Sequence, residues 1–145
     1  MLPEVTVNSI RDGVILALSN FFPTMDIFGE YIEQDFNAPC FYVKLLTTSH
    51  DHELDRRYKR SNSFDVHFFP AGADYNREAH SMAENLYVAL AKVNIDGAIY
   101  KGTKMNHEIV DNVLHFFVDF NFLVSTPKNE IKMQTLKQEG NVKNG

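Results

Sequence analysis

Apolar residues recur at three- and four-residue steps in two stretches of the chain, the spacing that gathers them on one side of a helix. The first stretch runs from about Thr6 to Phe21, where Thr6 is a suitable N-cap and Pro23 prevents continuation. The second runs from about Asp74 to Val93, with Asp74 in the capping position. The pattern predicts two amphipathic helices, each with one buried face.

Short runs of β-forming residues and alternating apolar and polar residues predict strands in the segments between and around these helices. Asp26–Ile32 is predicted as a short strand, and Cys40–Thr48 as a buried one. Residues 64–68 alternate strictly, which is typical of a half-buried strand. The polar segment Ser49–Arg60 is predicted as an exposed strand extension or a long hairpin arm, with a turn at Ser61 and Asn62.

The last strands are predicted as a hairpin with arms at about Ala98–Val110 and Val113–Ser125, joined by a turn at Asp111 and Asn112. Apolar residues occupy all of one face of the second arm. The reverse face mixes polar and apolar residues: Val113, His115, Phe117, Asp119, Asn121 and Leu123. We therefore expect something to cover part of that reverse face.

The predicted order of elements is α-β-β-β-α-β-β, which favours an α+β fold with an antiparallel β-sheet packed by two amphipathic helices. Residues 1–126 are assigned to this domain. Residues 127–145 are polar and aperiodic, so we expect a flexible C-terminal tail that becomes ordered only on assembly.

Composition narrows the protein class without supplying a function. A chain of 145 residues can bury one core, and its single cysteine, Cys40, excludes an internal disulfide framework and a cysteine zinc site. No apolar run reaches the roughly 18 residues of a membrane span, and the first residues lack the pattern of a signal peptide. We expect a soluble domain that is made in the cytoplasm and does not contact a membrane.

Charge is distributed unevenly around the net value of −5. Residues 1–35 carry six acids and one base, whereas residues 36–60 carry five bases and three acids. We define a basic cluster, Arg56, Arg57, Lys59 and Arg60. We define as its candidate complement an acidic patch, Asp26, Glu30, Glu33 and Asp35. Three interpretations remain open for the basic cluster: an assembly or lumen surface, a nucleic-acid contact, or an ordinary solvated surface.

No residue pattern indicates catalysis, a cofactor or a metal. His50 and His52 have the spacing that puts two side chains on one face of a strand, but no further histidines group with them in the sequence. The glycines lack phosphate-loop spacing, and Cys40 lies in an apolar run that favours a packing role. We therefore expect no catalytic, cofactor-binding or metal-binding residues and no enzymatic activity.

Four strings of this sequence resemble a small phage tail terminator family: EYIEQDFNAPCFYVKLL (30–46), RRYKRSNSFDVHFFP (56–70), GTKMNHEIVDNVLHFFVDFNF (102–122) and KMQTLKQEG (132–140). That family occurs in tailed phages, prophages and phage-tail-like bacteriocins of Gram-positive bacteria. The strings follow the family order over nearly the whole chain, although none of them carries catalytic chemistry.

The resemblance implies a structural subunit of a virion or phage-tail-like particle, located at the head-proximal end of the tail. Such subunits form a ring, typically a hexamer, that caps the tail tube, stops tube and sheath polymerisation and presents a docking surface. The implied partners are other copies of this chain, the tail tube protein, and possible sheath, head–tail connector or collar proteins. DNA is implied only as cargo passing through the lumen of a true phage.

Two alternatives to a tail terminator remain open from the sequence. One is a nucleic-acid-binding accessory protein that uses the basic cluster, although the net negative charge disfavours a general nucleic-acid binder. The other is a different neck component of the same particle. The sequence does not separate a phage from a headless bacteriocin.

Overall fold

The computed structural model describes residues 5–32 and 35–125, so the segment predicted as a polar tail, 127–145, lies outside the described residues. The elements follow in this order: α1 (Val7–Phe21), β1 (Asp26–Phe28), β2 (Cys40–Leu54), β3 (Arg57–Phe69), α2 (Tyr75–Ala89), β4 (Lys92–Ile95), β5 (Ala98–Val110) and β6 (Val113–Ser125). The α+β class predicted from the sequence is confirmed. The structure adds one short strand, β4, to the predicted order.

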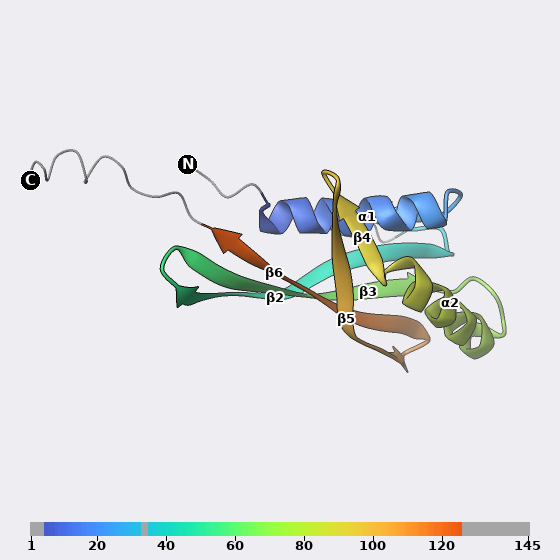
Figure 1. Ribbon diagram of the computed structural model, residues 1–145. Helices are drawn as coiled ribbons and strands as arrows, with labels where there is room; N and C mark the ends of the chain where they lie inside the picture. Colours follow the sequence, from blue (N-terminus) through green and yellow to red (C-terminus); the bar gives the residue numbers. More distant parts are fainter. Residues whose placement is uncertain (1–4, 33–34, 126–145) are drawn as a thin grey trace, which may run out of the picture.

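The strands form one sheet in the order β1-β2-β3-β6-β5-β4. β1 pairs with β2 in parallel, and the other neighbouring strands pair antiparallel. The β2–β3 hairpin is long, and its tip extends beyond the N-terminal end of α1 (Figure 1). Its register shifts twice, between Leu45 and Thr47 and between His52 and Leu54.

Both helices contribute their buried side chains to the same core, on one face of the sheet. Ile10, Val14 and Leu18 of α1 are fully buried, as the sequence periodicity predicts. The sheet residues of this core are Phe41, Val43, Phe64, Val66, Phe68, Leu114, Phe116, Val118 and Phe120. The registers that pair Phe41 with Phe68 and Phe68 with Leu114 place these alternating residues on a common face.

The N-terminus of α1 is held by a capping box. The Thr6 hydroxyl accepts a hydrogen bond from the Ser9 backbone N–H at 3.1 Å, and the Ser9 hydroxyl accepts one from the Thr6 N–H at 3.1 Å. Two otherwise unsatisfied backbone donors are therefore paired at the start of the helix. The predicted cap at Asp74 of α2 makes no side-chain capping bond.

α2 ends at Ala89, before the Val93 predicted from its apolar periodicity. Val93 instead belongs to β4, where its side chain is buried in the core. β5 passes close to the end of α2 at this point. The Gly102 N–H donates to the Ala91 carbonyl at 2.9 Å, and a Cβ atom at Gly102 would lie 2.3 Å from the Leu90 carbonyl oxygen.

The turn of the β2–β3 hairpin lies at Asp55 and Arg56, so the prediction of a turn at Ser61 and Asn62 is wrong. Asp55 has a φ of 55°, in the left-handed region that Asp tolerates better than most residues. Asn62 is fully buried inside β3. The polar segment predicted as a strand extension or hairpin arm is thus the two-stranded end of this hairpin. The first predicted strand is also shorter than expected and ends at Phe28.

Candidate functional site

The β2–β3 hairpin presents the basic cluster at its tip. Arg56 lies in the turn, and the other three cations lie in the first residues of β3. Successive side chains of a strand point to opposite faces, so Arg57 and Lys59 share one face while Arg60 lies on the other. The structure therefore divides the predicted basic cluster between two faces of the hairpin.

Arg60 contacts His50 of its own chain. Its guanidinium lies 3.3 Å (Nε) and 3.1 Å (Nη2) from His50 Nδ1. The His50 ring stacks on Tyr58 with ring centroids 4.3 Å apart, and the His52 ring lies 4.9 Å from the same tyrosine. His50 and His52 therefore share a strand face, as their spacing predicts, in an aromatic group that includes a guanidinium.

The acidic patch lies beside the first residues of β2. Asp26 pairs in register with Cys40, and Asp35 is exposed in the following loop. Glu30 forms an ion pair with Arg11 of α1 at 2.9 Å, and the Arg11 guanidinium also donates to the Gly29 carbonyl. Glu33 lies outside the described residues.

Cys40 is fully buried at the start of β2. Burial, together with the negative charge of Asp26, raises the pKa of the Cys40 thiol. A thiol with a raised pKa is a poor nucleophile at neutral pH, which agrees with the packing role predicted from its apolar neighbours.

The basic cluster and the acidic patch lie at opposite ends of β2. Asp26 pairs with the first residue of this strand, and Arg57 pairs with Leu54, its last. A strand of 15 residues is about 45 Å long at roughly 3.3 Å per residue. The two groups of charges therefore cannot meet within one chain.

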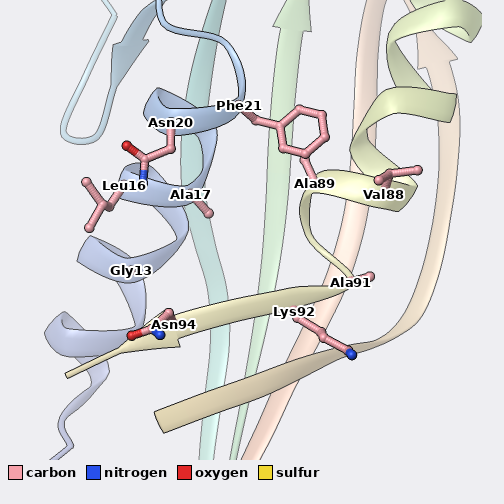
Figure 2. Close-up of a pocket in the computed structure, with 10 residues that line it drawn as sticks. All are labelled: Gly13, Leu16, Ala17, Asn20, Phe21, Val88, Ala89, Ala91, Lys92 and Asn94. Atoms are coloured by element: carbon pink, nitrogen blue, oxygen red, sulfur yellow. The ribbon is translucent and has the colours of Figure 1, made fainter. Parts of the chain in front are cut away.

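An open groove of about 490 Å³ lies between α1, the end of α2 and β4 (Figure 2). Leu16 and Phe21 of α1 border it from one side and Val88 of α2 from the other, with exposed fractions of 55%, 49% and 66%. In Figure 2, Phe21 points from the end of α1 toward α2. Isolated exposed apolar residues are common, but three that border one groove indicate a contact surface.

The sheet face opposite the helices carries a group that we call the Asp65 cluster: Asp65, His67 and His115. His115 Nδ1 lies 2.9 Å and His67 Nε2 lies 3.0 Å from Asp65 Oδ2. Burial by itself raises the pKa of Asp65, but hydrogen bonding and positive charge from the two rings outweigh it. The pKa of this carboxyl is therefore below its ordinary value.

Sequence reasoning missed the Asp65 cluster. The alternation in residues 64–68 indicates that Asp65 and His67 share a face of one strand. His115 joins them because the register of β3 and β6 pairs it directly with His67. The alternation in residues 64–68 and the fully apolar opposite face of β6 were the available signals, but the mutual register of the two strands does not follow from either strand alone.

Comparisons with known proteins give one informative match. A family model described as "Phage tail terminator protein" matches residues 9–132. No curated protein sequence matches the chain. Among 26 matching chains of solved structures, one is 17% identical and aligns over 86% of this chain and 99% of its own, with a TM-score of 0.46. Within the described residues, no helix is long and apolar enough to cross a membrane.

Proposed function

This chain belongs to the phage tail terminator family and is a structural component of a phage tail, and on that premise we propose that its copies form a ring on the end of the tail tube. The ring, a hexamer, stops polymerisation of the tube and of any sheath. Its outer surface docks a head connector or, in a headless particle, a collar. The match over residues 9–132 is the observation that carries this proposal.

The placement of opposite charges at two ends of the subunit supports a ring. A ring needs two different patches on each subunit, one for each neighbour. The basic cluster and the acidic patch lie at opposite ends of β2 and carry opposite charge. Contact between Arg57 or Lys59 of one copy and Asp26 or Asp35 of the next pairs these charges without using Glu30, which Arg11 already holds. Such pairing sets the order of subunits more than the strength of their contact.

The apolar groove supplies the surface whose burial would stabilise such a contact. Removal of apolar area from water contributes about 25 cal/mol per Å², whereas exposed ion pairs contribute about 0–1 kcal/mol each. We therefore assign Leu16, Phe21 and Val88 to the interface between neighbouring copies, with the charged groups fixing its direction.

The division of the basic cluster disfavours the alternative of a nucleic-acid-binding accessory protein. A groove that follows a phosphate backbone presents its cations along one surface. Here Arg57 and Lys59 lie on one strand face, and Arg60 is packed against His50 on the other.

Deletion of the gene from its phage or particle, followed by electron microscopy, tests the function. We expect tails of variable length or with frayed ends, and complementation with the intact gene should restore uniform tails. Uniform, capped tails in the deletion strain would contradict a terminator role and would favour another neck component.

A charge exchange tests the interface. Arg57→Glu with Lys59→Glu should abolish complementation, and adding Asp26→Lys and Asp35→Lys to the same chain should restore it, because each interface is then reversed on both sides. Lys101→Glu with Lys104→Glu, two exposed lysines of β5, is the matched control and should complement normally. Full complementation by the first pair alone would reject the charge assignment.

A further inference from the structure

All six histidines of the sequence lie among the described residues, and they fall into three pairs. His50 and His52 flank Tyr58, His80 Nδ1 lies 3.2 Å from His107 Nε2, and His67 faces His115 with ring centroids 4.4 Å apart. Imidazole is the commonest protein ligand of transition metals, so each pair is a candidate for comparison.

Only the third pair is joined by a carboxylate. Within residues 5–32 and 35–125, Asp65, His67 and His115 are the one group of three potential ligands whose atoms all lie within 4.8 Å of one another. We propose that the Asp65 cluster binds a divalent transition-metal cation, with Zn²⁺ as the best fit. Two imidazole nitrogens and one carboxylate oxygen are a ligand set that zinc takes, with a fourth position left for water or another donor.

The distances are close to those that a metal requires. Zinc bonds of about 2.0–2.1 Å in a tetrahedral arrangement separate the ligand atoms by about 3.3 Å. Asp65 Oδ2 lies 2.9 Å from His115 Nδ1 and 3.0 Å from His67 Nε2. Two of the three separations are therefore within about 0.5 Å of the tetrahedral value, and the third, between the two ring nitrogens, is at most 4.8 Å.

One oxygen of the cluster lacks the partner that a buried polar atom normally has. Among the described residues, Asp65 Oδ1 is buried and has no hydrogen-bond partner, whereas His67 Nε2, also buried, lies 3.0 Å from Asp65 Oδ2. The Asp65 side chain is only 9% exposed. Buried polar atoms without partners are rare in folded proteins, and a bound ion would satisfy this one.

The backbone holds the three ligands in place before an ion arrives. β3 and β6 are the two central strands, His67 and His115 are direct partners across them, and Asp65 lies two residues before His67. The two rings are partly exposed, which leaves a route for an ion from the sheet face opposite the helices. Ligands on rigid strands lose little freedom on binding, so the site is preorganised.

The other two pairs are poorer sites. Arg60 is directed at His50 Nδ1, and a guanidinium at that distance repels a second cation. His107 lies 2.8 Å from the Tyr87 hydroxyl and 3.2 Å from His80, with no carboxylate in the group. These pairs are matched controls because they occur in the same chain.

The test uses the full chain without a histidine tag, stripped with a chelator and titrated with Zn²⁺ at neutral pH. We expect saturation at one ion per chain by calorimetry. In long-range ¹H–¹⁵N spectra of the imidazoles, the resonances of His67 and His115 should shift while those of the other four histidines stay in place. Absence of saturable binding, or shifts confined to another pair, would overturn the proposal. This measurement needs no variant and so does not depend on how substitutions affect folding.

Variants then assign the ligands. His67→Gln, His115→Gln and Asp65→Asn should each weaken Zn²⁺ binding by more than about tenfold, the loss seen even for groups that only support a ligand. His80→Gln with His107→Gln should leave the affinity within about twofold, as expected for residues that do not touch the ion. Equal affinity in all of these variants would reject the site. The outcome of the Zn²⁺ measurements does not affect the proposal that copies form a ring. That proposal is tested separately, by tail length in the deletion strain.

Discussion

The Asn62 side chain donates a hydrogen bond of 3.0 Å to the carbonyl oxygen of Phe120, across β3 and β6. Both residues are fully buried. The Asn62 side-chain oxygen also accepts a hydrogen bond from the Thr48 hydroxyl at 3.3 Å. A polar residue therefore links three strands at the point where the helix-covered core ends and the exposed part of the hairpin begins.

Replacement of Asn62 should destabilise the fold through this link. Asn62→Ala removes both hydrogen bonds, and we expect a loss of about 2 kcal/mol in the free energy of unfolding. Thr48→Val removes only the bond at the exposed end and should cost less than about 1 kcal/mol. Urea denaturation of the two variants measures the difference, and equal losses would contradict the role given to the Phe120 contact.

Positions 102 and 97 require glycine for different reasons, so replacement of Gly102 or Gly97 by alanine should lower the stability by different amounts. At Gly102 a Cβ atom would lie 2.3 Å from the carbonyl oxygen of Leu90, the residue that follows α2, and we expect Gly102→Ala to cost about 3 kcal/mol. Gly97 has a φ of 88° and open space around it, so Gly97→Ala should cost only about 1 kcal/mol. Thermal melts compare the two, and a larger loss at Gly97 would show that β5 does not pass α2 so closely.

Cys40 should be nearly inert to alkylation in the folded chain. Its thiol is buried and its pKa is raised, so the reactive thiolate is scarce at pH 8. We expect mass spectrometry to show much slower reaction with iodoacetamide than in urea. Asp26→Asn removes the neighbouring negative charge and should speed the reaction slightly. Rapid labelling of the native wild-type chain would contradict the placement of Cys40.

Charges introduced into the groove between the helices should prevent assembly without unfolding the subunit. Leu16→Glu and Val88→Glu replace exposed residues, so each should change stability by no more than about 0.5 kcal/mol. Each should nevertheless prevent capping of tails, because an unpaired carboxylate would be buried at the proposed interface. Asn85→Glu, on an exposed position of α2, is the control. Normal complementation by the Leu16 and Val88 variants would remove the groove from the interface.

Prediction of helices and strands from the sequence was most accurate where one periodicity extends through a whole element. The stripe of α1 and the alternation of β6 each identify an element and its buried face. The prediction failed at Asn62, where Ser61 and Asn62 resemble a turn although the true turn lies among charges at Asp55 and Arg56. A buried side-chain hydrogen bond to another strand has no local signature. Tertiary packing decides whether such a polar segment forms a turn or continues as a strand.

The candidate sites were predictable to different degrees. Opposite charge in the basic cluster and the acidic patch is visible in the sequence, whereas their separation along β2 is not. The Asp65 cluster depends on the pairing of His67 with His115, residues far apart in the chain. Such non-local registers are set by the packing of the whole sheet.

The two register shifts of β2 bear on the solubility of the subunit before it is incorporated into a particle. Among the described residues, β1 pairs with only Cys40, Phe41 and Tyr42, so the remainder of β2 has an open edge on that side. Open edges invite strand addition from other chains and growth into fibrils. The irregularities after Leu45 and after His52 interrupt this edge, and Lys44, Asp51 and Glu53 add charge along it. The bulges and the charged side chains of β2 therefore limit fibril growth from this edge of the subunit.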